Sequence, residues 1–316
     1  MGRLNEVGPK QSRIPQASRP EDGAPEQFPI GWSAARATMY TDEKKAMAHH
    51  FCQHDLLVKH NQNPSNTRET AATFLATAGT SPYMVVRESL AWIKANSSTY
   101  GQFAIMWYTP ASLVAAALRD FRTENHHLRS AADLFLFPGR LNPDVECVVG
   151  PTAVRFTKLR RTKFTYSLLG AYAFDMASGK ASFHYPEEVG IQRACAFLPA
   201  RHKFLFLDSS KFEKKEEGEP GYSIRQLLNE TSAVTIYTVA SANSNTIAED
   251  FHALAESILI TTNEDEPIDR AAEEEGELAR SPQRMFRLCV VGTKERPAEN
   301  IAIRGYLRRH SEPRNT

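Results

Sequence analysis

The chain has few cysteines and no long apolar run, and both absences narrow the classes of protein to which it can belong. Its 316 residues contain only four cysteines, with no CxxC pair among them: Cys52, Cys147, Cys195 and Cys289. Such scattered cysteines are typical of reduced thiols in the cytosol rather than of a disulfide framework. No run of 18 apolar residues is present to span a bilayer, and the first 30 residues lack the apolar core of a signal peptide. We therefore expect a cytoplasmic protein without membrane contact.

The sequence also lacks the motifs of several common catalytic and cofactor sites. It contains neither G-x-x-x-x-G-K-[ST] nor G-x-G-x-x-G, and no G-x-S-x-G nucleophile elbow. The histidine-rich stretch HHFCQH (49–54) puts His50 and His54 on one helix face, but it supplies no third ligand and no H-E-x-x-H pattern. We therefore expect no metal and no cofactor, and we assign no catalytic residue from motifs alone.

The charge balance gives no indication of a nucleic-acid partner. The formal net charge is +1, so no overall field attracts a polyanion. The basic stretches KLRRTK (158–163) and GYLRR (305–309) are short and are adequately explained as solvated faces. The sequence therefore does not support direct DNA binding.

Changes in composition indicate one folded region between less ordered segments. Residues 1–38 are rich in Pro, Gly, Ser, Arg and Gln, and such a stretch buries too little apolar surface to offset the entropy of ordering it. We expect a disordered arm there, a polar loop at 59–67 and a folded domain over 39–262. An acidic linker (263–281) and two strands within 282–316, packed on the same domain, complete the expected organisation.

Apolar runs alternate with amphipathic segments in the folded region, which predicts an α/β fold. Thr41 is the expected N-cap of the first helix, and Pro110 is expected in the first turn of the third. The predicted strands cover 71–78, 102–108, 132–139, 164–175, 202–210 and 232–241, with two more at 284–295 and 300–309. The predicted helices cover 41–57, 83–95, 110–121, 186–198 and 246–259. This alternation predicts a doubly wound, mostly parallel, Rossmann-like sheet.

Glycines and hydroxyl groups recur where the predicted strands end. TAGTS (77–81) lies between a strand and a helix, where backbone N–H groups and the partial positive charge of a helix start would hold a phosphate or carboxylate. A plain tight turn explains this segment equally well when it is taken alone. Four later predicted strands also end in segments that contain a glycine or a hydroxyl group: YTPAS (108–112), FPGR (137–140), LGAY (169–172) and DSSK (208–211). Strand ends that converge on one edge of a sheet would form a crevice in which Lys211 reaches an anion.

The stretch FLFLDSSKF (204–212) gives the most specific local signal. A fully apolar run predicts a buried strand, and Asp208, two serines and Lys211 follow directly at its carboxyl end. The simpler alternative is that Asp208 and the serines cap the next segment while Lys211 points into solvent.

Seven segments follow one another in the order of a known family pattern. They are DEKKAMA (42–48), TAGTS (77–81), YTPASLVAAAL (108–118), FPGRLNPDVECVVGPTA (137–153), LLGAYAFDMASGK (168–180), PEEVGIQRA (186–194) and FLDSSKF (206–212). In this order they resemble the effector-sensing domain of the DeoR family of bacterial sugar-metabolism regulators. That domain shares a sugar-phosphate isomerase-like fold with ribose-5-phosphate isomerase and glucosamine-6-phosphate deaminase. The likeness extends over about residues 42–255, and the proline-rich first 40 residues resemble no winged helix-turn-helix.

The resemblance implies a ligand-binding site in the predicted crevice. It implies that the turn at 79–81 holds a phosphate and that Glu188 and Lys211 lie beside the sugar, where Lys211 neutralises an anion. As ordinary alternatives, Glu188 is a first-turn helix acid and the glycines are turn residues. The implied ligand-binding residues are Gly79, Thr80, Ser81, Gly139, Gly170, Glu188 and Lys211.

Three positions depart from the family pattern. Thr77 replaces the aspartate before the glycine turn, Pro110 replaces an asparagine, and Tyr172 stands where the pattern has an aspartate. Pro110 removes a backbone donor, and the bulk of Tyr172 would fill part of the crevice.

The leading hypothesis from the sequence is a non-enzymatic sensor of a phosphorylated sugar or similar anion. It would form a homo-oligomer and pass ligand occupancy to a regulatory partner chain. One alternative is a sugar-phosphate isomerase or deaminase in which Glu188 or Asp208 is the proton-transfer base. Two further alternatives are a degenerate interaction module and a transcriptional regulator with an unrecognised DNA contact.

Overall fold

The computed structural model describes residues 39–56, 71–100, 104–159, 163–213, 218–240, 244–258, 284–292 and 301–307. The expected disordered arm (1–38), the polar loop (59–67) and the acidic linker (263–281) lie outside the described residues.

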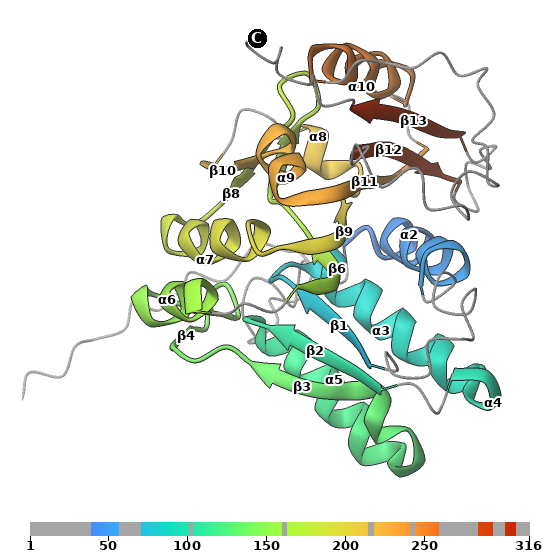
Figure 1. Ribbon diagram of the computed structural model, residues 1–316, viewed down its shortest axis with the longest axis vertical. Coiled ribbons are helices and arrows are strands. Elements are labelled where there is room, and N and C mark those ends of the chain that lie inside the picture. Colours follow the sequence, from blue (N-terminus) through green and yellow to red (C-terminus); the bar gives the residue numbers. More distant parts are fainter. Residues whose placement is uncertain are drawn as a thin grey trace, which may run out of the picture.

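An eight-stranded sheet forms the centre of the molecule (Figure 1). Its order is β13-β12-β11-β9-β6-β1-β2-β3, and only the β12–β13 pair is antiparallel. The strands are β1 (Ala71–Ala76), β2 (Ala104–Thr109), β3 (Asp133–Leu136), β6 (Phe164–Leu169), β9 (Ala200–Phe206), β11 (Thr231–Val239), β12 (Arg284–Val291) and β13 (Ile301–Leu307). The predicted α/β fold with a doubly wound, mostly parallel sheet is confirmed.

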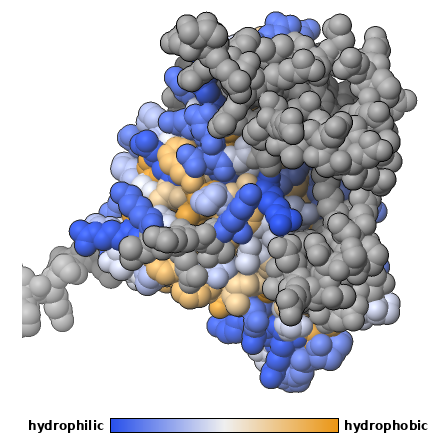
Figure 2. All heavy atoms as spheres, viewed as in Figure 1, coloured by the Kyte–Doolittle hydropathy of each residue, from blue (hydrophilic) through white to orange (hydrophobic). Residues whose placement is uncertain are grey.

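Helices cover both faces of this sheet. The described helices are α2 (Thr41–His54), α3 (Thr80–Ala95), α4 (Ser97–Tyr100), α5 (Ser112–Glu124), the 3-10 helix η1 (His126–Ala132), α6 (Pro151–Leu159), α7 (Pro186–Ala196), α8 (Ser210–Glu213), α9 (Ile224–Glu230) and α10 (Ser244–Ile258). Within the described residues, no helix combines the length and apolar character needed to cross a bilayer. Figure 2 shows hydrophilic side chains gathered at the lower end of the view, over the end of α5.

Alternate residues of β9 divide between two apolar cores. Phe204 and Phe206 belong to the first core, where the ring of Phe51 from α2 packs against both at centroid distances of 5.0 and 5.6 Å. Leu205 belongs to the second core, which also contains Phe251 from α10. Because successive side chains of a strand point to opposite faces, the apolar run in this segment is explained by burial on both sides of the sheet.

Two helix starts differ from the sequence predictions. Thr41 is the first residue of α2 rather than its cap, since Tyr40 precedes the helix in a left-handed conformation with φ of 54°. Pro110 lies outside α5, which begins at Ser112. The carbonyl of Pro110 accepts a hydrogen bond of 2.7 Å from the N–H of Val148, and this bond holds the residue in a loop between two sheets.

Two small sheets were not predicted, because their strands are too short to show a periodic pattern. One is a hairpin of β4 (Arg140–Asn142) and β5 (Cys147–Val149). The other contains β7 (Ala173–Asp175), β8 (Lys180–Phe183) and β10 (Glu219–Ser223).

The order of the strands reverses between β1 and β6. The chain proceeds from β1 through β2 to β3 on one side, and then returns to β6 on the other side of β1 before continuing to β9 and β11. Open α/β sheets bind their ligands outside the carboxyl ends of the strands at such a switch point. The topology therefore indicates where a site is expected.

Candidate functional site

A pocket of about 60 Å3 opens at this switch point. Residues 78–82, which follow β1, and residues 170–172, which follow β6, form two of its walls. Further walls come from the start of α5, the β4–β5 turn, α7 and α8. Six of the seven predicted site residues line this pocket: Gly79, Thr80, Ser81, Gly170, Glu188 and Lys211.

The first turn of α3 presents backbone donors to the pocket. Gly79 is the N-cap residue, with φ of 136° and no side-chain cap, and Thr80 and Ser81 begin the helix as buried residues. The first N–H groups of a helix have no partner within the helix, and the helix dipole adds partial positive charge there. The turn therefore has the features of an anion cradle, as its sequence indicated.

Gly170 allows the end of β6 to approach this cradle closely. A Cβ atom at position 170 would lie 2.9 Å from Cδ of Pro82 and 3.0 Å from its Cγ, which is closer than carbon atoms pack. Because the proline ring is part of the first turn of α3, neither partner can yield by rotating a side chain. The absence of a side chain at Gly170 thus keeps the two walls together.

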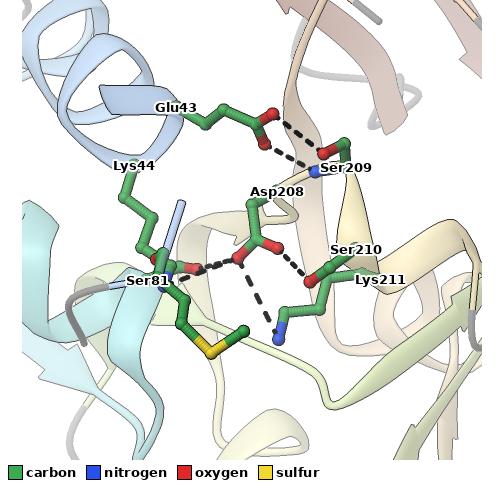
Figure 3. Close-up of polar contacts among 8 residues, drawn as sticks. Glu43, Lys44, Ser81, Asp208, Ser209, Ser210 and Lys211 are labelled. Carbon is green, nitrogen blue, oxygen red and sulfur yellow. Dashed lines mark hydrogen bonds and ion pairs between the residues drawn. The ribbon is translucent and has the colours of Figure 1, made fainter. Parts of the chain in front are cut away.

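Asp208 connects the cradle to Lys211. Its side chain is 1% exposed, and its Oδ2 accepts a hydrogen bond of 3.2 Å from Ser81 Oγ. The Nζ atoms of Lys44 and Lys211 each lie 4.0 Å from the same oxygen, and Ser210 Oγ donates to Oδ1. Figure 3 shows Asp208 at the centre of these contacts. Asp208 itself does not line the pocket, but it contacts Ser81 and Lys211, which do.

The start of α2 also packs against this loop, which sequence reasoning missed. The two carboxylate oxygens of Glu43 accept hydrogen bonds of 2.8 Å from the N–H and the Oγ of Ser209. Lys44 donates to the carbonyl of Met39 at 2.5 Å as well as facing Asp208. In the sequence, Glu43 is visible only as an acid in a first helical turn, and such a residue does not reveal a contact with a loop 166 residues away.

Glu188 enters the pocket from the first turn of α7. Gln192, one turn later and almost fully buried, donates through Nε2 to Glu188 Oε1 at 2.7 Å and to the carbonyl of Ala78 at 3.0 Å. The amide group of Gln192 therefore links the carboxylate of Glu188 to Ala78, the residue that precedes the glycine turn at 79–81. The sequence identified Glu188 but gave no indication of Gln192.

Gly139 is the predicted site residue that does not line the pocket. It adopts φ of 151° before β4, and a Cβ atom there would lie 2.7 Å from Val148 Cγ1 and 3.3 Å from the Cβ of Ala153. Gly139 is therefore needed for close packing of this turn against Val148 and Ala153, and it does not line the pocket with the other predicted residues.

The positions that depart from the family pattern have distinct environments. Thr77 is buried and donates its N–H to the carbonyl of Leu168 at 3.0 Å, whereas its hydroxyl has no partner among the described residues. Tyr172 lines the pocket and is 9% exposed, with its ring 4.8 Å from that of His184. Tyr172 therefore reduces the open volume, as its size suggested.

Two acidic residues of the β4–β5 turn also line the pocket, Asp144 and Glu146. They lie in the segment FPGRLNPDVECVVGPTA (137–153), in which the sequence analysis assigned only Gly139 to the site. With Glu188, they place three carboxylates on the walls that face the cradle and Lys211.

Thiol chemistry has no support in this arrangement. All four cysteines are buried and unpaired. Burial raises the pKa of Cys52 to about 12, and burial together with the charge of Glu188 raises the pKa of Cys147 well above its ordinary value. Such thiols are protonated and unreactive at neutral pH.

Among the described residues, the histidine-rich face of α2 has only two neighbouring imidazole rings. The rings of His50 and His54 lie 4.2 Å apart, and burial, with the neighbouring His54, lowers the pKa of His50 to about 4. Within the described ranges, no three His, Cys, Asp or Glu side chains are grouped so that they could hold a metal ion.

Comparison with known proteins gives matches to solved structures alone. No protein-family model matches the chain, and no curated protein matches it. A ribose 5-phosphate isomerase A from Methanocaldococcus jannaschii is 10% identical with a TM-score of 0.37, over 83% of this chain and 98% of that one. The ribose 5-phosphate isomerases from Plasmodium falciparum and Neisseria gonorrhoeae are 7% and 9% identical, both with a TM-score of 0.31. For these two, the match covers 54% of this chain and about half (53%) of the other.

These findings correct the leading hypothesis from the sequence. The prediction of a non-enzymatic sensor that acts through a partner is contradicted by this comparison, in which the three solved structures reported are ribose 5-phosphate isomerases. That prediction also depended on finding no well-supported acid or base, whereas Glu188 lines the pocket with its carboxylate held by Gln192. No family model supports the narrower resemblance to the DeoR family.

Proposed function

We propose that the protein is an enzyme that isomerises a phosphorylated sugar in the pocket between the ends of β1 and β6. The observation that carries the proposal is the meeting of three elements in one pocket: the start of α3, Lys211 and Glu188. The first two are suited to hold an anion, and the third is suited to move a proton.

The anion-binding end brings positive charge to the pocket. The ammonium groups of Lys44 and Lys211 each lie 4.0 Å from Asp208 Oδ2 and are almost fully buried, and Lys211 lines the pocket. The dipole of α3 adds partial positive charge at the same end. A phosphate bound by Thr80, Ser81 and Lys211 would be held through charge-assisted hydrogen bonds.

Glu188 is the group that we assign to proton transfer. In an aldose–ketose isomerisation, its carboxylate would take the proton from the carbon next to the carbonyl and return it to the former carbonyl carbon. The proton of the hydroxyl group on that adjacent carbon passes to the carbonyl oxygen, so the carbonyl and the hydroxyl group exchange places and no external oxidant or reductant is needed. Gln192 acts as a positioning residue, because its bond of 2.7 Å fixes one oxygen of Glu188. General bases placed in this way contribute about 10²- to 10⁴-fold to a rate.

The proposal is tested by a turnover assay of the full chain on pentose and hexosamine phosphates. Glu188→Gln should lower the turnover number by at least about 10²-fold, with little change in the affinity for phosphate.

Glu187→Gln is the matched control, because Glu187 is adjacent on α7 but binds Arg140 and Asn142 outside the pocket, each at 2.9 Å. Equal activity of Glu188→Gln and the wild type would rule out Glu188 as the base. No turnover of any of these sugars, combined with a Lys211→Ala variant that behaves as the wild type in every assay, would instead favour a pocket without a ligand.

A further inference from the structure

Glu146 lines the same pocket, and its carboxylate has no partner in the described part of the chain. Its Oε2 is buried, and no described residue donates a hydrogen bond to it. A buried acceptor without a donor is costly, and native structures retain few of them. A donor that enters the pocket with a ligand would remove this cost.

The backbone of Glu146 is held in an uncommon conformation. Its φ of 49° lies in the left-handed region, which residues other than glycine adopt rarely. Ser112, at the start of α5, donates to the carbonyl of Glu146 twice, through its N–H at 2.9 Å and its Oγ at 3.0 Å. These two bonds fix the residue whether or not a ligand is bound.

The hairpin that carries Glu146 is anchored at two further points. The N–H of Val148 donates to the carbonyl of Pro110 at 2.7 Å, which ties β5 to the loop before α5. Glu187 of α7 accepts from Arg140 and Asn142, both at 2.9 Å, which ties β4 to the helix that carries Glu188. The backbone that carries the carboxylate of Glu146 is therefore held in place, and a ligand that uses this carboxylate does not have to order the hairpin.

The charges of the pocket are separated between its walls. The start of α3 and Lys211 favour an anion, whereas Asp144, Glu146 and Glu188 favour hydrogen-bond donors. A simple anion would satisfy only the first group. A molecule with a phosphate at one end and hydroxyl groups at the other would satisfy both.

We propose that Glu146 determines specificity by accepting a hydrogen bond from a hydroxyl group of the ligand, so that the site selects a phosphorylated polyhydroxy compound over a simple anion. This proposal rests on the proposed function, because it assumes that the phosphate occupies the cradle. It assigns to Glu146 a role in recognition, distinct from the proton transfer assigned to Glu188.

The test is a calorimetric titration of the full chain with inorganic phosphate, ribose 5-phosphate and glucose 6-phosphate. The wild type should bind at least one of the two sugar phosphates more tightly than inorganic phosphate. Glu146→Gln should reduce this preference by about 10-fold, since hydrogen bonds to a charged acceptor are roughly twice as strong as neutral ones. Its affinity for inorganic phosphate should not change. Glu124→Gln is the control, because it removes the same charge from an exposed side chain at the end of α5, outside the pocket, and it should keep the preference.

Three results would overturn the role of Glu146. They are an unchanged preference in Glu146→Gln, an equal loss in Glu124→Gln, or a wild type that binds neither sugar phosphate better than inorganic phosphate. In each case the proposed function would stand if phosphate still binds and turnover still depends on Glu188. If the wild type binds none of the three probes and turns over no sugar phosphate, both proposals fail together. The glutamine side chain has the same shape, and equal melting temperatures would show that the variants are folded.

Discussion

Replacing Asp208 by asparagine should destabilise the protein by about 3–5 kcal/mol, the usual cost of removing one partner from a buried ion pair. Asp208, Lys44 and Lys211 have side-chain exposures of 1%, 2% and 6%, and each ammonium lies 4.0 Å from Oδ2. At an effective dielectric constant of about 20, one such pair is worth about 4 kcal/mol before desolvation is counted. Asparagine keeps an acceptor for Ser81 but leaves two buried cations facing a neutral group.

Urea denaturation of the wild type and Asp208→Asn measures this loss, and the melting temperature should fall by about 10 °C. Asp120→Asn serves as the control, because Asp120 and Arg119 form an ion pair at 2.8 Å with side-chain exposures of 58% and 72%. Such an exposed pair contributes about 0–1 kcal/mol. Adding Lys44→Met to Asp208→Asn should recover part of the lost stability, because it removes one of the two uncompensated charges. A free energy of unfolding for Asp208→Asn within about 1 kcal/mol of the wild type would refute the reasoning that the buried charges depend on this carboxylate.

Two further predictions concern buried positions. Burial lowers the pKa of Lys203 from 10.5 to about 7, against a smaller opposite effect of Glu230. Between pH 7 and pH 10.5 the unfolded chain therefore binds more protons than the folded chain, so the free energy of unfolding rises with pH. For the wild type it should rise by about 2 kcal/mol from pH 7 to pH 9, and for Lys203→Met it should not. Urea denaturation at each pH measures this difference. Gly170→Ala should cost about 1–3 kcal/mol and weaken phosphate binding in calorimetry, because its Cβ would lie 2.9 Å from Pro82. Gly190→Ala, whose Cβ would meet nothing closer than 3.7 Å, should be neutral or stabilising, and an equal loss in both glycine variants would contradict the role of Gly170.

The sequence predicted the sheet well because its strands are apolar on both faces. The run from Phe204 in β9 to Leu207 just after the strand divides between two cores, so burial leaves a continuous apolar signal that is easy to recognise. The glycine turn at 79–81 and Lys211 were assigned to the site from strand ends together with the family resemblance, because parallel strands deliver their carboxyl ends to one edge of the sheet.

The rest of the site depends on contacts that leave no local pattern. Gln192 reads as an ordinary residue of an amphipathic helix, and its two hydrogen bonds become visible only when α7 is placed beside the cradle. Glu146 lies in a turn between strands of three residues each, which are too short for a period-two pattern. Gly139 was assigned to the site because it follows a strand, but its neighbours Val148 and Ala153 show that it is a packing position.

The central claim is that Glu188 moves a proton on a phosphorylated sugar bound between the ends of β1 and β6. The most direct measurement is the incorporation of solvent deuterium into ribose 5-phosphate or another aldose phosphate, followed by nuclear magnetic resonance. We predict incorporation at the carbon next to the carbonyl with the wild type and with Glu187→Gln, and none above background with Glu188→Gln. Equal incorporation by Glu188→Gln and the wild type, or none with the wild type for any pentose or hexose phosphate, would contradict the account.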